Sequence, residues 1–423
     1  MLHCGLYEVD ITPALGMEMP GHFRLRRADG ILERLYAYAA YFENDAGEKI
    51  VIVTCDVISI PDEPAMKTRT EIARDLDMPV SAVMLCATHT HYGGPVKTTG
   101  DFVHSCSAYI DFLNSRMHDA AIYAAQRKRP VRIGHGRGIE GTLAHYRDFV
   151  LPDGSYATNA HVPGMRALGE IDPEVGVLRI DNADGTPYGL IANYACHCDS
   201  VGGVTKFSSD YPGAMRDTLR KTYGTDFMPL FVNGFSGNIN HIDFEHGTSS
   251  EPGYYRRMGR ILAGAVSETY EKIFLSDNDN IGSADERFTV PSRVPDAETL
   301  AWAETVRPED GVVNNYYASE AKRMGAEGSQ PIPVTVQVLK IGDLMIYGMP
   351  GEIYVEYAKI IKDGSPSEYT MTANLANGGI GYVCIRELFK KGIYPARICR
   401  SAKVYPDAGY EMTERLLKLA ETL

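Results

Sequence analysis

Short apolar, β-rich runs recur along this chain, and they end abruptly in polar or glycine-rich residues. Clear examples lie at residues 49–54, 82–87, 189–194, 229–232 and 344–348. Buried strands of a sheet that is covered on both faces have this near-continuous apolar pattern. Apolar residues at helical spacing predict helices at residues 64–75, 109–127, 213–223, 254–274 and 352–362. This alternation predicts an α/β fold with a mixed sheet core flanked by helices.

Nothing in the sequence divides the chain into separate units. Its 423 residues contain no internal repeat, no low-complexity tract and no long Pro/Gly/Ser linker. The polar stretch at residues 276–280 is the nearest approach to a boundary, and we interpret it as a surface loop. We therefore predict a single domain spanning residues 1–423.

The charge of the chain argues against several classes of partner. Lys and Arg number 42 against 55 Asp and Glu, a net charge of -13, which repels a nucleic-acid backbone. No stretch has the length and apolar character of a membrane span, and no secretory signal is visible. The eight cysteines lack a disulfide-scaffold spacing. We expect a cytoplasmic protein with no nucleic-acid or membrane partner; self-association into a homo-oligomer is left open.

A His-x-His pair follows the predicted strand at residues 82–87. If that strand continued through His89 and His91, its two-residue period would put both imidazoles on one face, toward one metal ion or one substrate. A Gly-Gly-Pro turn at residues 93–95 follows and would let backbone approach a ligand closely. Without further support, two hydrogen-bonded surface histidines explain the pair equally well.

Two further candidate ligands follow other predicted strands. His197 lies between Cys196 and Cys198, but strand alternation points both sulfurs away from the face that His197 uses, so the imidazole is the better ligand. Glu352 follows a Pro-Gly pair at the predicted start of a helix, where the helix dipole alone also favours a carboxylate. Two histidines, a carboxylate and an open position describe a hydrolytic zinc centre. Because the candidates lie far apart in sequence, they form a site only if the fold gathers them.

Six motifs occur in an order that is typical of one enzyme family. They are THTHYGGP at 88–95, ACH at 195–197, SDYPG at 209–213, NGFSGN at 233–238, PGE at 350–352 and GYV at 381–383. With the opening VDITP at residues 9–13, they resemble the neutral/alkaline, non-lysosomal ceramidases and their shorter bacterial homologues, over residues 5 to 410. The resemblance implies a ceramidase-like catalytic domain that acts as a zinc-dependent amidohydrolase.

The resemblance also implies a set of zinc ligands. These are the first histidine of the His-x-His pair, a second strand-end histidine, the glutamate after Pro-Gly and a tyrosine before valine, which correspond here to His89, His197, Glu352 and Tyr382. Tyrosine is an uncommon ligand, and composition alone would not select Tyr382 among 26 tyrosines.

Other active-site residues follow from the same resemblance. His91 and Tyr394 match residues that act on the reacting groups beside the metal, and Arg147 matches, within one or two positions, an arginine that holds substrate. The chain departs from the family at Asn240, which occupies the position of a serine implicated in catalysis. A covalent serine route is then closed unless nearby Ser236 substitutes.

These features predict a zinc-dependent hydrolase that cleaves an amide or related acyl bond in a small molecule. Ceramidases carry an additional C-terminal β-sandwich domain, whereas this sequence stops soon after its last motif, so we expect a small polar substrate rather than ceramide. One alternative is a zinc-dependent hydrolase or lyase of a sugar or cyclitol derivative. A second alternative is a non-catalytic binding protein on the same fold.

Overall fold

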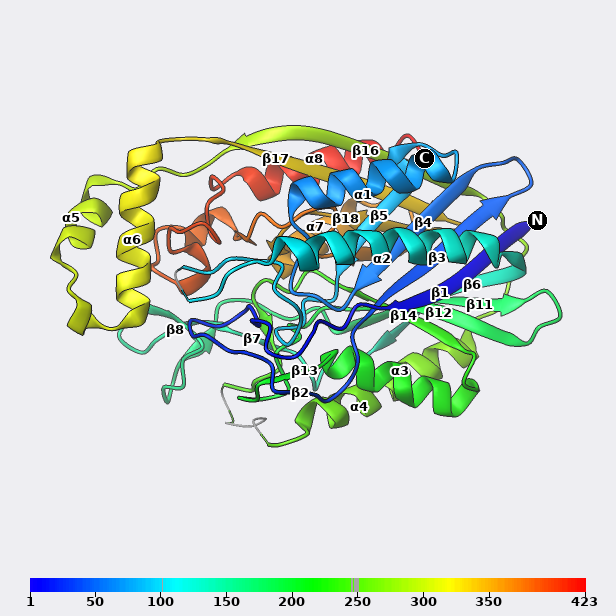
Figure 1. Ribbon diagram of the computed structural model, residues 1–423, viewed down its shortest axis with the longest axis horizontal. Coiled ribbons are helices and arrows are strands. Elements are labelled where there is room, and N and C mark those ends of the chain that lie inside the picture. The colour runs from blue at the N-terminus through cyan, green and yellow to red at the C-terminus, as the bar shows by residue number, and fades with distance from the viewer. Residues whose placement is uncertain (101, 245, 247–250) are drawn as a thin grey trace.

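The computed structural model describes residues 1–100, 102–244, 246 and 251–423, and a large mixed sheet runs through its middle (Figure 1). Its strands, in spatial order, are β14 (Met228–Asn233), β12 (Pro187–Tyr194), β11 (Glu174–Asn182), β6 (Arg129–Ile139), β1 (Leu2–Asp10), β3 (Tyr36–Asn44), β4 (Lys49–Cys55) and β5 (Val83–Ala87). The pairs β12/β14 and β4/β5 are parallel and the other neighbours are antiparallel. The predicted mixed α/β fold is therefore confirmed.

A second sheet packs on one face of the first. It has the order β16 (Ile281–Pro291), β17 (Pro331–Ile341), β18 (Leu344–Gly348) and β20 (Tyr369–Ala373). The two sheets share a buried apolar cluster in which Ile52 and Met84 meet Leu339 and Ile346. Because these side chains leave no room for water, the two sheets form one continuous core.

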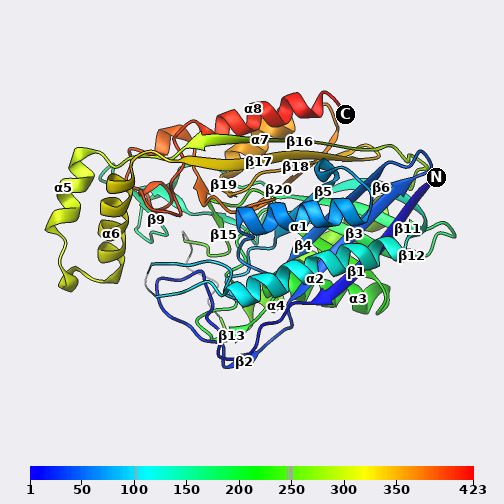
Figure 2. The same cartoon turned by 45° about the horizontal axis from the view of Figure 1, so that its top comes forward.

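Helices cover the outer faces of both sheets (Figures 1 and 2). On the large sheet they are α1 (Asp62–Asp75), α2 (Ser107–Gln126), α3 (Asp210–Tyr223) and α4 (Tyr254–Lys272). On the small sheet they are α7 (Val355–Gly364) and α8 (Ala408–Ala420). The result is a stack of four layers in the order helices, sheet, sheet, helices. The remaining pair, α5 (Ala297–Thr305) and α6 (Val312–Glu327), lies at one end of the stack, between β16 and β17 in the chain.

Short strand pairs shape the loops at the end of the large sheet where β5 and β12 finish. They are β2 (Gly30–Ile31) with β13 (Lys206–Phe207), β7 (His145–Tyr146) with β15 (Ile239–Asn240), and β19 (Glu352–Ile353) with β21 (Tyr382–Val383). A three-stranded ribbon adds β8 (Asp148–Val150), β9 (Tyr156–Thr158) and β10 (Arg166–Ala167).

Two local predictions about the candidate ligands are wrong. Strand β5 ends at Ala87, and His89 has a left-handed φ of 71°, so His89 and His91 do not share a strand face. Glu352 does not begin a helix: it lies in β19, and α7 starts at Val355. The reason is local. The Asn374 side chain accepts a hydrogen bond from the Ile353 N–H and holds that residue outside the helix, whereas the Asn238 side chain accepts from the N–H of Val355, the first residue of α7.

Candidate metal centre

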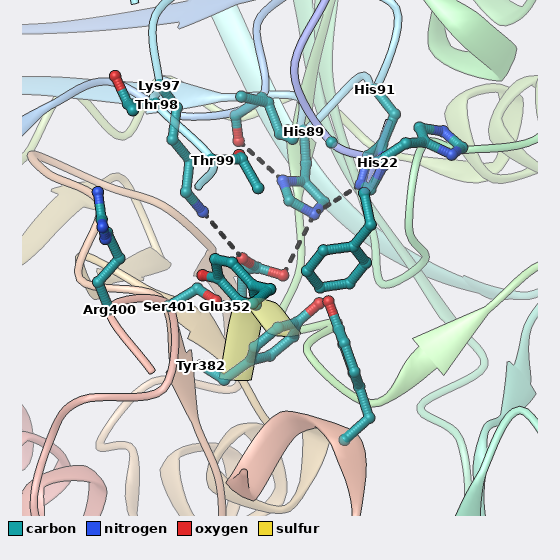
Figure 3. Close-up of a pocket in the computed structure, with 15 residues that line it drawn as sticks. His22, His89, His91, Lys97, Thr98, Thr99, Glu352, Tyr382, Arg400 and Ser401 are labelled. Atoms are coloured by element: carbon teal, nitrogen blue, oxygen red, sulfur yellow. Dashed lines mark hydrogen bonds and ion pairs between the residues drawn. The ribbon is translucent and has the colours of Figure 1, made fainter. Parts of the chain in front are cut away.

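Three of the four predicted zinc ligands meet at the end of the large sheet. His89 follows β5, His197 follows β12, and Glu352 comes from the loop after β18. The Nε2 atoms of His89 and His197 lie 3.5 and 3.6 Å from the same Glu352 oxygen, Oε2 (Figure 3 shows His89 and Glu352). The two imidazole centroids are 4.6 Å apart with nearly perpendicular planes. The exposed fractions of His89, His197 and Glu352 are 1%, 1% and 4%, so the point where they meet is shielded from solvent.

Backbone carbonyls fix the tautomer of both histidines. His89 Nδ1 lies 2.8 Å from the carbonyl oxygen of Ile58, and His197 Nδ1 lies 2.8 Å from that of Ser236. A carbonyl only accepts, so each Nδ1 carries the proton and each Nε2 presents a lone pair toward Glu352. Within the described part of the chain, His197 Nε2 is buried without a hydrogen-bond partner. This pattern of Nδ1–H held by a carbonyl and Nε2 left open is typical of metal-binding histidines.

The surroundings of His197 and Glu352 keep these two groups in the protonation states that a cation needs. Burial lowers the pKa of His197 to about 4, assisted by the positive charge of Arg147. Burial raises the pKa of Glu352, but His89, His197 and Lys97 outweigh it and hold that pKa well below its usual value. Neutral imidazoles and an ionised carboxylate are the forms that bind metal.

Tyr382, the fourth predicted ligand, lies beside Glu352. The two residues are directly paired in the parallel strands β19 and β21. Burial and the Glu352 charge raise the pKa of Tyr382 well above its usual value, while Arg147 opposes that shift. Arg147 Nη2 donates to the Tyr382 hydroxyl at 3.1 Å and to the Gly237 carbonyl at 2.5 Å. The predicted substrate-holding arginine thus contacts a candidate ligand, and it does not line the cavity described below.

His91 and Tyr394 border the same point. His91 Nε2 lies 3.3 Å from His89 Nε2, and the donor atoms of His89, His91 and His197 all lie within 4.8 Å of one another. The Tyr394 ring stacks edge-on to Tyr382 with centroids 5.7 Å apart. The chain therefore contains a buried group of three histidines that can hold a metal ion, with the predicted reacting-side residues next to it.

Neither candidate for the serine position faces the cavity. Asn240 lies in β15, where its Oδ1 accepts a hydrogen bond from the Ile242 N–H at 3.2 Å. The Ser236 hydroxyl donates to Asn233 and accepts from Asn374, both at 3.3 Å, and it is fully buried. Ser236 reaches His197 through its backbone carbonyl, which accepts a hydrogen bond from His197 Nδ1, and not through its hydroxyl.

A cavity opens over the candidate ligands (Figure 3). Aromatic rings of Phe23, Tyr316, Tyr382 and Tyr394 form part of its wall. The other part is polar and is formed by Lys97, Thr98, Thr99, Arg400 and Ser401. Helix α6 contributes to both parts, because it carries Tyr316 and also Glu320, whose carboxylate binds Arg400 at 2.6 Å.

Sequence reasoning missed several residues of this site. His22 and Asp199 bind each other at 3.2 Å beside His91, and Lys97 Nζ lies 3.9 Å from Glu352 Oε1. No motif or periodicity marks His22 or Lys97; only the proximity of Asp199 to His197 in sequence could have drawn attention to it. Two other buried carboxylates have partners away from the candidate ligands. Asp56, after β4, accepts from Arg216 Nη2, and Asp210, the first residue of α3, accepts from the Ser200 N–H.

The cysteines are not part of the cluster. All eight are free thiols. Cys198 Sγ donates to the Thr88 carbonyl at 2.9 Å, and Cys196 Sγ points toward the Leu143 carbonyl at 3.9 Å. The histidine, and not the flanking thiols, is therefore the group of this segment that faces Glu352.

Comparison with known proteins identifies the fold. No family model matches the sequence. No curated protein sequence matches it either. Among solved structures, the neutral ceramidase from Pseudomonas aeruginosa superposes with a TM-score of 0.77 at 19% identity, covering 99% of this chain and 74% of that chain. The chain has the neutral ceramidase fold. A ceramidase complexed with C2 gives a TM-score of 0.75 at 18% identity, with the same coverage. The resemblance carried by the sequence motifs is thus confirmed at the level of the fold.

The helices give no sign of a membrane span. Of those in the described residues, none combines the length and the apolar character that crossing a lipid bilayer requires.

Proposed function

We propose that this protein is a zinc-dependent hydrolase that cleaves an amide or related acyl bond in a small polar substrate. One observation carries the proposal: two buried Nε2 atoms, from His89 and His197, approach a single carboxylate oxygen of Glu352 beneath a cavity. The neutral ceramidase fold supports it, since the two similar structures are both described as ceramidases.

The donor set fits zinc. The buried, unpartnered Nε2 of His197 needs a partner that accepts a lone pair, and a divalent cation is such a partner. His89, His197, Glu352 and Tyr382 are the residues that we assign to hold it. When bound at such a site, zinc polarises a substrate carbonyl and lowers the pKa of bound water toward neutrality.

Residues of the chain supply the remaining chemistry. Burial raises the pKa of Tyr394, so its hydroxyl stays protonated and can donate a hydrogen bond to a developing oxyanion. His91 lies with Nε2 beside His89 Nε2, which carries a lone pair, so His91 Nε2 carries a proton and is placed to donate a hydrogen bond at the reacting groups. Arg147 holds the Tyr382 hydroxyl and favours its ionised form. With Asn240 and Ser236 both engaged elsewhere, water is the nucleophile that we assign.

The polar wall of the cavity supports a polar substrate. Lys97 and Arg400, each beside a carboxylate, bring N–H donors, and Thr98, Thr99 and Ser401 bring hydroxyl groups. Aromatic rings facing these hydroxyls also suit a sugar or cyclitol ring, so an N-acyl amino sugar is the second substrate class that we test. The partner of this site is in either case a small molecule.

The experiment uses protein loaded with one equivalent of zinc and a panel of N-acyl amino acids, N-acyl amino sugars, lactones, glycosides and N-acyl sphingosine. We expect hydrolysis of a polar N-acyl compound that a chelator abolishes and zinc restores. The His89→Ala variant should lose activity and retain one equivalent of zinc fewer than the natural chain at saturating zinc, whereas His104→Ala, which removes an exposed histidine, should keep both the activity and the zinc content. Preferred turnover of N-acyl sphingosine would overturn the polar substrate. A His89→Ala protein that retains as many equivalents of zinc as the natural chain at saturating zinc would overturn the metal centre.

A further inference from the structure

We propose a second divalent-cation site, formed by His22, His91 and Asp199, next to the candidate zinc centre. The inference does not depend on the catalytic activity proposed above. The three residues come from three separate segments, the loop after Pro20, the loop after β5 and the loop after β12, and the structure brings them together at the cavity. Figure 3 shows His22 and His91 side by side on the wall opposite Arg400.

The donor atoms are spaced for one ion. One nitrogen or oxygen from each residue lies within 4.8 Å of the others. His22 Nε2 is 3.2 Å from Asp199 Oδ1, and His91 Nδ1 is 3.8 Å from Asp199 Oδ2. Two imidazoles and a carboxylate with open positions form a facial set that binds Zn²⁺, Mn²⁺, Fe²⁺ or Co²⁺.

The nitrogen of His91 that faces this cluster is the second observation. Within the described residues, His91 Nδ1 is a buried atom with no hydrogen-bond partner, and its 3.8 Å separation from Asp199 is too long for a hydrogen bond. The residue as a whole is 9% exposed. A buried imidazole nitrogen without a partner lowers the stability of the folded chain, unless a group between the nitrogen and the carboxylate binds it. A cation bound by His22 and Asp199 is such a group.

The backbone holds His91 firmly in this orientation. Its N–H donates to the Cys198 carbonyl at 3.0 Å, and its own carbonyl accepts from Arg26 Nη2 at 2.6 Å. Gly21 lies against the ring, and a Cβ atom there would come within 2.6 Å of Nδ1. A glycine at this position, with φ of 106°, therefore lets the chain bring His22 close to the cluster.

One imidazole ring then joins the two sites. Its Nε2 faces His89 at 3.3 Å, and its Nδ1 faces Asp199. Nδ1 can bind a cation only in the tautomer that carries the proton on Nε2, so the second ion would set a hydrogen-bond donor pointing at the first centre. The ion would also anchor the segment that carries Phe23, whose ring packs against Tyr394 and Tyr316 in the cavity wall.

The test is the stoichiometry of zinc. Metal-free full-length protein is titrated with Zn²⁺ by calorimetry, and the number of ions retained after desalting is measured by elemental analysis. We expect two equivalents in the natural chain and one in His22→Ala, with the loss confined to one ion. Asp199→Asn should lose the same equivalent, which guards against a folding defect in either variant. His104→Ala, the matched loss of an exposed imidazole, should keep both.

This experiment distinguishes failure of the proposed zinc hydrolase from failure of the proposed second cation site. His22→Ala that folds and binds as many equivalents as the natural chain overturns the second site, whatever happens at His89. His89→Ala is expected to bind one equivalent of zinc, and the double variant His89→Ala/His22→Ala none. That result supports the second site even if no hydrolytic activity is detected.

Discussion

His197, which is buried, and His135, which is partly buried, have pKa values shifted in the same way and different neighbours. Burial is the largest cause that lowers the pKa of each to about 4. Within the described chain, Nε2 of each is buried without a hydrogen-bond partner. His197 Nε2 faces the Glu352 carboxylate at 3.6 Å, with the His89 ring beside it. His135, in β6, packs on the Tyr369 ring with centroids 5.6 Å apart.

The contrast separates burial from function. A neutral imidazole with an open nitrogen is common to both places, so it does not by itself mark a metal site. The difference is the number of metal-binding side chains nearby. Among the described residues, His197 belongs to a group of three side chains that could hold one metal ion, and His135 belongs to no such group. A second donor and a carboxylate at the same point are what give His197 its assigned role.

The largest effect expected from this contrast is on catalysis. His197→Ala should lower hydrolytic activity more than about 10⁴-fold, roughly 5.5 kcal/mol of transition-state stabilisation, because the ligand set is broken. His135→Ala removes a partly buried imidazole with the same direction of pKa shift and should leave activity and zinc content unchanged. Activity against the best N-acyl substrate and zinc per chain are the measurements. Equal loss of activity and zinc in His197→Ala and His135→Ala would contradict the assignment of His197 as a metal ligand.

The sequence predicted which residues meet at the candidate metal centre better than it predicted the backbone conformation that brings them together. The strand ends after residues 82–87 and 189–194 could be recognised because buried strands have continuous apolar runs. The left-handed backbone of His89 and the non-helical Glu352 could not be recognised, because such features depend on distant contacts, as in the hydrogen bond that the Ile353 N–H donates to the Asn374 side chain. Tyr382 was found only through the resemblance.

The second sheet and the His22 cluster were missed for a related reason. Strand β16 is largely half-exposed and carries charged residues, among them Asp285, Glu286 and Arg287, so no apolar run marks it. His22 and Asp199 come from segments 177 residues apart that touch only in the folded chain. Local periodicity records the burial of one segment and carries no information on which distant side chain it meets.

The buried ion pair of Asp56 and Arg216 extends the contrast from neutral buried groups to charged ones that are paired with each other. Arg216 Nη2 binds both Asp56 oxygens at 2.9 and 2.7 Å, and its guanidinium lies 4.2 Å from the Tyr38 ring centroid. Asp56→Ala leaves the buried Arg216 charge uncompensated and should cost about 4 kcal/mol of unfolding free energy. Urea denaturation measures it. Zinc stoichiometry of the folded variant should not change, and a loss of zinc would make Asp56 part of the metal centre.

His135 also gives the fold a pH dependence that zinc cannot remove. Its pKa is about 4 in the folded chain and about 6.5 when unfolded, so between these values the unfolded chain binds a proton that the folded chain does not. Stability should therefore fall as pH drops from about 6.5 to 4, by up to about 3 kcal/mol from this group. In His135→Phe the decline should be shallower by that amount. Parallel stability curves for the two proteins over this range would contradict the assignment.

The smallest expected effect comes from comparing Arg147, whose guanidinium contacts a candidate zinc ligand, with Arg137, whose guanidinium does not. Arg147 donates to the Tyr382 hydroxyl at 3.1 Å, whereas Arg137 lies near His135 on the surface and pairs with the exposed Glu368. Arg147→Met should weaken zinc binding about tenfold, roughly 1.4 kcal/mol, because a residue that orients a ligand is lost while the ligand stays. Arg137→Met should leave zinc affinity unchanged.

Competition with a chromophoric chelator measures both affinities. Arg147→Lys should recover part of the lost zinc affinity if the positive charge beside Tyr382 is what matters. Equal affinities in the two methionine variants would mean that Arg147 holds substrate, as the sequence resemblance first implied, and not the tyrosine.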